Sequence, residues 1–315
     1  MDNKLTYDFS IVIPVFNNEG TIDLLMNEIN EEVIRKNKNL NGEIIFCDDG
    51  STDKSFNKLK KIRNKYSNIK IIKFTKNFGQ TSAIYAGLNY SDAKCYVISS
   101  ADLQDPVETI NIFLSNFFND HYNIIVGSRL MRNDGFISEF LSSVSAWIVN
   151  RLNNNILPHG FFDFVLISNR VKNLILQKKN SNPFWQIEII KTGFEAKYVP
   201  YSRKTRILGK SMWTFSKKIK YFLDAIVGYS FAPLRIMSLI GVIFSFSGIS
   251  YATYILIAKI YGYGEFVFGW APIMIVILIT SGFQMLFLGI IGEYIWRIFA
   301  QVNNSEDYVI SEIIS

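Results

Sequence analysis

Cysteine and histidine are scarce in this 315-residue chain, which contains two of each. So few soft ligands argue against a disulfide framework or a cysteine-based metal site, and Cys47 and Cys95 are expected to be buried free thiols. The chain also has no Gly-x-Gly-x-x-Gly after its first predicted strand and no Gly-Lys-Ser/Thr phosphate loop. These absences argue against a dinucleotide-dependent dehydrogenase and against a nucleoside triphosphatase.

Charge is missing from two long stretches, residues 236–258 and 266–292, which contain no Asp, Glu, Lys or Arg. As helices they would each be about 35–40 Å long, enough to cross a bilayer. Two transmembrane helices are therefore expected, and the alternative is a pair of buried core helices. A cleavable signal peptide is also missing, because residues 1–8 are polar and the first apolar run is short. The first domain is therefore expected in the cytoplasm.

The net charge of the chain is +6 and its pI is about 9.1, a balance that would suit binding to nucleic acid. The basic residues instead flank the charge-free stretches: Lys217, Lys218, Lys220, Arg235 and Arg297. By the positive-inside rule, both ends of the helical hairpin are expected to face the cytoplasm. No nucleic-acid partner is expected.

Short apolar runs alternate with amphipathic stretches in the first half of the chain. The runs, which are expected to be strands, are residues 9–15, 43–47, 69–74, 96–99, 123–127 and, further on, 162–168. The stretches, which are expected to be helices, are residues 21–35, 54–66, 80–89 and 106–118. Near-continuous apolarity indicates strands covered on both faces, hence an α/β domain with a mostly parallel, Rossmann-like sheet. Lysines beside an apolar stripe in residues 213–232 are typical of an amphipathic helix at a membrane interface.

Polar loops follow the first four predicted strands, at residues 14–19, 48–53, 76–80 and 100–105. In an open parallel sheet, ligands bind beyond the carboxyl ends of the strands. One acidic loop would mean little, but four polar loops on one sheet edge predict a pocket. The fourth loop ends a buried strand in acidic and amide oxygens, the hard ligands that a divalent cation carrying a diphosphate needs.

Four segments of this first domain, SIVIPVFNNE, FCDDGSTD, NFGQTSAIYAGL and ADLQDP, resemble the family 2 inverting glycosyltransferases, which have the GT-A fold. Further along, VGSRLMR, RILGKSMW, FAPLR and GEYIWRIF are similar to the subgroup that transfers a sugar to a polyprenyl phosphate. That subgroup includes dolichol-phosphate mannose synthases and bacterial undecaprenyl-phosphate glucosyltransferases. The resemblance extends over essentially the whole chain, with the hairpin in the bacterial arrangement.

The resemblance implies a site for the nucleotide of a sugar donor, formed by Pro14, Phe16, Glu19, Asp48, Asp49, Ser100, Ala101 and Asp102. Carboxylates suit ribose hydroxyls and base N–H groups, and an aromatic ring can stack on a base. The alternative for Asp48 and Asp49 is a turn that caps the next helix, since aspartate is common in both places.

A metal site on Asp102 and Gln104 is also implied, within a segment that usually reads Asp-x-Asp-x-Gln in the family. The first aspartate is Ser100 here, which removes one charge from a site expected to hold Mg²⁺ or Mn²⁺ on the donor diphosphate. Because Mg²⁺ needs only one or two protein carboxylates, the site is expected to persist on Asp102. Asp105 is expected to cap the helix predicted to begin at Pro106.

Arg129, Arg132, Arg206, Lys210 and Ser211 are implied to hold the phosphate of a lipid acceptor and the donor diphosphate. Guanidinium groups pair well with phosphate oxygens. For the residues near the membrane, the alternative is a basic patch attracted to anionic lipid. Asp163 is the candidate for the residue that orients the attacking phosphate or acts as a base, and it completes the expected catalytic set with Asp102 and Arg129.

The expected organisation is a GT-A domain at residues 1–212, an interfacial helix at 213–232, a transmembrane hairpin at 233–299 and a cytoplasmic tail at 300–315. The expected activity is inverting transfer of a hexose, with UDP-glucose the first candidate donor, to undecaprenyl phosphate for cell-surface glycan modification. The expected location is the bacterial inner membrane, as a multi-pass protein and candidate homo-oligomer. One alternative is a catalytically silent membrane scaffold. A processive polysaccharide synthase has less support, because its usual Gln-x-x-Arg-Trp motif is missing after Gln186.

Overall fold

The computed structural model describes residues 6–130, 162–177, 184–204, 232–261, 270–302 and 308–315. The chain divides into two compact units, one containing residues 1–218 and 305–315 and the other residues 219–304. The predicted interfacial helix at 213–232 lies almost entirely outside the described residues, and the predicted domain boundaries stay predictions.

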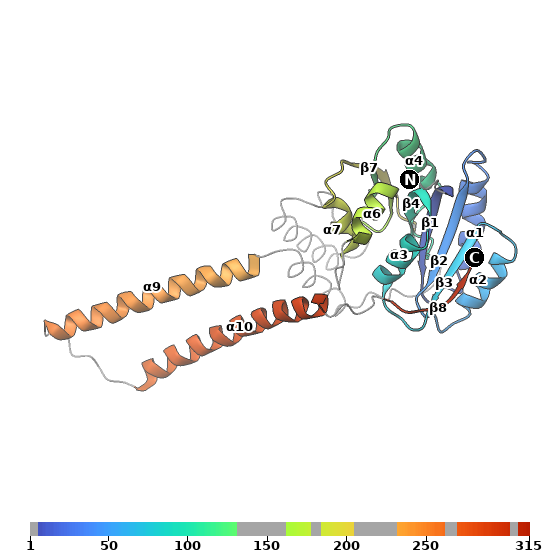
Figure 1. Cartoon of the computed structure of the whole chain (residues 1–315). Helices are drawn as coiled ribbons and strands as arrows, with labels where there is room; N and C mark the ends of the chain where they lie inside the picture. Colours follow the sequence, from blue (N-terminus) through green and yellow to red (C-terminus); the bar gives the residue numbers. More distant parts are fainter. Residues whose placement is uncertain (1–5, 131–161, 178–183, 205–231, 262–269, 303–307) are drawn as a thin grey trace. The chain divides into compact units, whose positions relative to one another are not determined.

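The first unit is built on a sheet whose described strands number eight, in the order β7-β5-β6-β4-β1-β2-β3-β8 (Figure 1). The strands are β1 (Tyr7–Val15), β2 (Gly42–Asp48), β3 (Ile69–Phe74), β4 (Ala93–Ile98), β5 (Ile124–Arg129), β6 (Val165–Ser168), β7 (Ala196–Tyr201) and β8 (Ile310–Ile314). β4, β1, β2 and β3 run parallel to one another, as do β5 and β7. β6 is antiparallel to both β4 and β5, and β8 is antiparallel to β3. The predicted α/β class with a mostly parallel sheet is confirmed.

Helices cover both faces of this sheet. The described helices of the unit are α1 (Ile22–Ile29), which continues into a π-helical turn (Asn30–Ile34), α2 (Ser55–Arg63), α3 (Gln80–Asn89), α4 (Thr109–Phe118), α6 (Asn169–Gln177) and α7 (Trp185–Ile190). Successive side chains of a strand point to opposite faces. In β2, Ile44 and Phe46 join the core beneath α1, α2 and α4, whereas Ile45 and Cys47 pack with Ala83 of α3. Near-continuous apolarity therefore did indicate strands buried on both sides.

The last residues of the chain form a strand, where a tail was expected. β8 pairs with β3, placing Ile314 opposite Ile71, and Tyr308 just before it stacks on Phe74 with ring centroids 5.1 Å apart. Because β3 would otherwise present unpaired backbone groups at the sheet edge, the pairing satisfies them. The C-terminal segment is therefore part of the first unit.

The second unit contains two long helices, α9 (Ala232–Ile260) and α10 (Trp270–Val302). They contact each other through Phe244 and Phe283, whose ring centroids lie 5.0 Å apart. The predicted multi-pass localisation is contradicted, since no helix in the described ranges combines the length and the apolarity that a bilayer crossing requires. The prediction relied on the missing charge of residues 236–258 and 266–292, which is not by itself evidence of a bilayer crossing. The transmembrane role of this hairpin is unconfirmed.

Candidate functional site

The predicted site residues gather at one edge of the sheet because the strands that carry them share a direction. β1, β2, β4, β5 and β7 all end at this edge, and the antiparallel β6 begins there. The edge therefore receives Asp48 after β2, Ser100–Asp105 after β4 and Arg129 at the end of β5. It also receives Asp163, which precedes β6, and Tyr201, which ends β7.

The loops after β1 and β2 are joined to each other by hydrogen bonds. The Asn17 N–H donates to Ser51 Oγ at 3.0 Å, and the Lys54 N–H donates to Glu19 Oε2 at 2.9 Å. Pro14 and Phe16 are partly buried beside this junction. Glu19 was predicted to contact the donor, and one of its carboxylate oxygens accepts a hydrogen bond from Lys54, the residue before α2.

The paired aspartates after β2 have different surroundings. Both oxygens of Asp49 accept backbone N–H groups, from Phe78 at 2.6 Å and from Gly79 at 3.0 Å. Asp49 therefore holds the loop that leads into α3, whereas the alternative for this pair was a turn that caps the next helix, α2. Asp48 is fully buried, and its Oδ1 accepts the Ser51 N–H at 3.2 Å. No partner for its Oδ2 exists within the described structure, which makes Asp48 the better candidate for a ligand contact.

Burial raises the pKa of both aspartates, and for Asp49 the pKa reaches about 6. For Asp49 the two backbone N–H donors oppose the effect of burial, and the neighbouring charge of Asp48 adds to it. For Asp48 the hydrogen bond from Ser51 opposes burial. Two carboxylates in a water-poor position disfavour simultaneous ionisation, so a ligand that donates hydrogen bonds to Asp48 would relieve the site.

The segment after β4 forms a tight turn around Ser100. The Ser100 hydroxyl donates to Asp102 Oδ1 at 2.6 Å and also lies 3.0 Å from Asp105 Oδ2. The Gln104 N–H reaches the same Asp102 oxygen at 3.2 Å. Leu103, between them, has a φ of +58°, an uncommon conformation for a large side chain. Asp102 and Gln104 therefore flank Leu103 in a single turn, and the backbone strain of this turn lies at Leu103.

Asp105 does not cap a helix as predicted, because its side chain is held elsewhere. It is 3% exposed, its Oδ1 accepts the Tyr201 hydroxyl at 2.8 Å, and α4 begins only at Thr109. Burial raises the pKa of Asp105, and the nearby carboxylates of Asp163 and Asp102 raise it further, although the hydrogen bond from Tyr201 opposes this. Asp105 belongs to the site as an internal link rather than as a helix cap.

Arg129 and Asp163 form an ion pair at this edge. Arg129 Nη2 lies 2.7 Å from Asp163 Oδ2, and Arg129 Nε donates a long hydrogen bond to the Tyr201 hydroxyl at 3.4 Å. Burial disfavours the guanidinium charge, but Asp163, Tyr201 and Asp105 outweigh it, so the pKa of Arg129 is raised. Asp163 is 42% exposed and Arg129 16% exposed, which leaves the pair accessible to a ligand.

The predicted metal ligands fit a divalent cation only with help from a substrate. In the part of the chain that is described, no three His, Cys, Asp or Glu side chains are grouped as metal ligands. Asp102 and Gln104 supply oxygen atoms from one turn, and Mg²⁺ characteristically combines one or two carboxylates with phosphate and water. The residues present are therefore compatible with a cation that arrives with a diphosphate.

Comparison with known proteins identifies the family. The model of glycosyl transferase family 2 matches residues 10–169. The chain belongs to glycosyl transferase family 2. This family 2 protein is 32% identical to the putative glycosyltransferase CsbB of Bacillus subtilis over 96% of its own length and 91% of that protein. It is 27% identical to the prophage bactoprenol glucosyl transferase homolog of Escherichia coli, over 96% and 97% of the two chains. The predicted resemblance to polyprenyl-phosphate glycosyltransferases is confirmed.

The fold of this family 2 protein is similar to that of solved enzymes. Glucosyl-3-phosphoglycerate synthase from Mycobacterium tuberculosis, crystallised with Mn²⁺ and UDP-glucose, aligns with a TM-score of 0.52 at 16% identity. The alignment covers 71% of this chain and 79% of that one. At this identity the likeness shows a GT-A-like α/β fold and nothing finer.

Other predicted residues fall in two groups. Arg132, Arg206, Lys210 and Ser211 lie outside the described residues. Ala101 is buried, and its carbonyl oxygen accepts the Thr21 hydroxyl at 2.6 Å, which ties the metal segment to α1. Asp102 and Gln104 are partly exposed at the same turn. The predicted residues that the structure describes thus follow strands that end, or precede a strand that begins, at one edge of the sheet, and Glu19 and Asp49 also support neighbouring loops.

Tyr201 is the main site residue that sequence reasoning missed. It lies at the end of β7 (Ala196–Tyr201), a strand that was not among the predicted strands. The available signal was the pair of apolar residues Val199 and Tyr201, two positions apart, with the exposed Pro200 between them. Proline fits because β7 is an edge strand of the sheet.

Proposed function

We propose that this glycosyltransferase moves a hexose, with glucose from UDP-glucose the first candidate, onto a polyprenyl phosphate such as undecaprenyl phosphate. The relatives named bactoprenol glucosyl transferases support the lipid acceptor, since the similarity extends over nearly the full length of both chains. The solved fold neighbour with UDP-glucose supports a nucleotide-sugar donor.

The observation that carries the proposal is the Arg129–Asp163 ion pair at the sheet edge that also carries Asp102. A guanidinium held by a carboxylate presents its remaining N–H groups in a fixed direction, which suits the oxygens of a phosphate. A phosphate monoester has a second pKa near 6, so it is largely ionised at pH 7 and hardly needs a base. Asp163 therefore acts by orienting Arg129.

In the proposed reaction, an oxygen of the acceptor phosphate attacks the anomeric carbon of the sugar in line with the departing diphosphate. One C–O bond forms, the C–O bond to the nucleoside diphosphate breaks, and the configuration inverts. A divalent cation bound at Asp102 and Gln104 would neutralise charge on the leaving diphosphate. Asp48 would accept a hydrogen bond from the base or ribose through its unpaired Oδ2.

Exposed apolar side chains support a lipid as the acceptor. In α9, Leu239 is 61% exposed and Phe246 is 67% exposed, and in α10 Leu286 is 55% exposed. Large apolar groups left uncovered in such numbers favour an apolar partner. A polyprenyl chain has the chemistry to cover them.

The test incubates the purified full-length protein with radiolabelled UDP-glucose and other nucleotide sugars, Mg²⁺ or Mn²⁺, and undecaprenyl phosphate. Labelled polyprenyl-phosphate sugar is the expected product. No labelled lipid from any donor would refute the activity and favour the silent scaffold.

Two substitutions separate the roles within this assay. Asp102→Asn should lower turnover by about 100-fold or more, since it removes the principal carboxylate at the developing charge. Arg129→Lys keeps the charge but loses the forked geometry, and we expect about a tenfold loss or more. Asp120→Asn, an exposed position beyond the end of α4, is the matched control and should retain full activity.

A further inference from the structure

We propose that Tyr201 is a positioning residue that holds the Asp102 segment and Arg129 in a fixed relation through Asp105. The inference rests on the proposed function, because it assigns Asp102 to the donor side of the reaction and Arg129 to the acceptor side. The residues that match the family model end at 169 and therefore do not include β7.

A continuous series of polar contacts joins the two sides. The Tyr201 hydroxyl donates to Asp105 Oδ1 at 2.8 Å and accepts from Arg129 Nε at 3.4 Å. The other oxygen of Asp105 lies 3.0 Å from Ser100 Oγ, which contacts Asp102 at 2.6 Å. The contacts of the Tyr201 hydroxyl join β7 to the segment after β4 and to β5, whereas the contacts of Ser100 lie within the turn after β4. The Tyr201 hydroxyl is therefore the point where the two halves of the site meet.

Backbone contacts around β7 reinforce this connection. The Leu130 N–H donates to the Tyr201 carbonyl at 3.0 Å, and the Lys204 N–H donates to the Gln104 carbonyl at 2.9 Å. The end of β7 thus holds both the residue after Arg129 and the strained turn at Leu103. A left-handed leucine persists only where its surroundings fix it, and Tyr201 and Lys204 supply contacts that do so.

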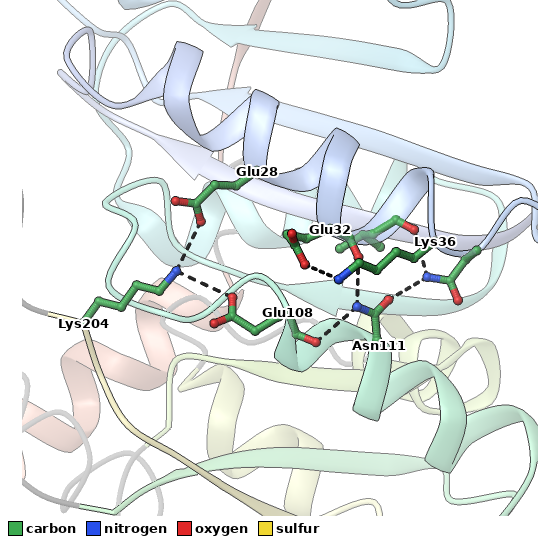
Figure 2. A network of polar contacts seen from close by, with 8 residues as sticks. Glu28, Glu32, Lys36, Glu108, Asn111 and Lys204 are labelled. Carbon is green, nitrogen blue, oxygen red and sulfur yellow. Dashed lines mark hydrogen bonds and ion pairs between the residues drawn. The ribbon is translucent and has the colours of Figure 1, made fainter.

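Lys204 is fixed in turn by carboxylates on two helical elements. Its Nζ lies 3.4 Å from Glu28 Oε2 on α1 and 3.5 Å from Glu108 Oε2, the residue before α4 (Figure 2). Asn111 of α4 donates to the Glu32 carbonyl at 2.9 Å, which links α4 to the π-helical turn that continues α1. Lys204 is therefore a partner in an ion-pair network, and the end of β7 is anchored independently of Tyr201.

The position of the Tyr201 ring does not depend on its hydroxyl. The ring makes an edge contact with Phe164 at a centroid distance of 5.7 Å, and a Cβ at Gly127 would come within 2.9 Å of it. Tyr201→Phe should keep the ring in place and delete only the contacts to Asp105 and Arg129. Loss of activity in this variant would report the polar link.

The matched control is Tyr96→Phe, because Tyr96 is also buried and its hydroxyl also contacts several polar groups, at the opposite end of the sheet. Its partners are the Ala93 N–H at 3.0 Å, Asn169 Oδ1 at 3.1 Å and Lys172 Nζ at 3.2 Å. Each substitution removes one buried hydroxyl, so the two variants should lose similar stability.

The experiment measures kcat, both KM values and the unfolding transition for the full-length wild type, Tyr201→Phe and Tyr96→Phe. We expect Tyr201→Phe to lower kcat about tenfold with KM for the donor changed less than threefold, and Tyr96→Phe to keep kcat within twofold. The double variant Tyr201→Phe/Ser100→Ala should lose less than the product of the single effects, since both interrupt one series of contacts. An unchanged kcat in Tyr201→Phe, or strictly multiplicative losses, would overturn the proposal.

Hydrogen exchange of residues 100–105 supplies a readout that does not require activity. Tyr201→Phe should accelerate exchange in this segment, while Tyr96→Phe should leave it unchanged. If the wild type makes no labelled lipid, the proposed function fails and this measurement alone decides the role of Tyr201. Equal exchange in wild type and Tyr201→Phe would refute it.

Discussion

Replacing Ser100 with aspartate tests how the site handles charge. The Ser100 hydroxyl lies 2.6 Å from Asp102 Oδ1 and 3.0 Å from Asp105 Oδ2. An aspartate at this position would place a third carboxylate where a neutral donor now stands. Ser100→Asp should therefore destabilise the metal-free protein and make its stability depend strongly on a divalent cation.

The magnitude follows from Coulomb's law. Two unit charges about 4 Å apart repel by about 4 kcal/mol at an effective dielectric constant of about 20. Side-chain movement and proton uptake relieve part of this repulsion, so we expect a loss of about 2–3 kcal/mol at pH 7. For a domain of about 200 residues, that loss lowers the melting temperature by roughly 5–10 °C. A bound cation at 100 times its Kd would return about 2.7 kcal/mol.

The assay is thermal unfolding of full-length wild type and Ser100→Asp at pH 7, in EDTA and in increasing Mn²⁺. Ser100→Asn is the control, since its amide matches the shape of aspartate without the charge. We expect a low melting temperature only for Ser100→Asp in EDTA, with recovery in Mn²⁺.

Two results would refute this reasoning. Equal stability of Ser100→Asp and Ser100→Asn in EDTA would mean that position 100 does not face the two carboxylates. A destabilised Ser100→Asp that does not respond to Mn²⁺ or Mg²⁺ would mean that the segment is no cation site.

Two further predictions concern stability. Burial raises the pKa of Asp49 to about 6, so its contribution is fully present below pH 4 and is lost as pH rises through 6. The free energy of unfolding of wild type relative to Asp49→Asn should therefore fall by up to about 3 kcal/mol between pH 4 and pH 7, measured by urea denaturation, and a pH-independent difference would contradict it. Tyr308→Ala removes the stack on Phe74 and should cost about 1–2 kcal/mol and accelerate hydrogen exchange in β8, whereas exposed Val309→Ala should cost under about 0.5 kcal/mol. Similar losses in these two variants would argue that the stack contributes nothing.

The central strands and their loops were predictable because local signals sufficed. β1, β2 and β3 are apolar runs bounded by polar residues, and a parallel sheet places all the loops that follow them at one edge. The grouping of Asp48 with Asp102 therefore followed from strand direction alone. The mostly parallel sheet and the likeness to family 2 were both within reach of the printed residues.

What failed depended on contacts distant in sequence. β8 pairs with β3, which lies more than two hundred residues earlier in the chain. The short isoleucine-containing sequence of β8 does not indicate which strand it pairs with. Asp105 looked like a helix cap because Pro106 follows it, but Tyr201 binds its carboxylate from β7. The localisation prediction failed for another reason, since it took missing charge as sufficient for a membrane crossing.

Serine at position 100, in place of the aspartate usual in the family, lowers the negative charge of the site but still gives Asp102 a hydrogen-bond donor. Around Asp105, the carboxylates of Asp102 and Asp163 and the guanidinium of Arg129 lie close enough to affect its charge. Burial further favours the neutral form of Asp105, which reduces the negative charge that a donor diphosphate would meet. An aspartate at position 100 would raise that charge and bind a cation more tightly, but it would also repel a diphosphate that arrived without one. The hydrogen bond from Ser100 orients the Asp102 carboxylate, and the neutral serine keeps the negative charge of the segment lower than an aspartate would. This arrangement favours a site in which donor and cation enter together.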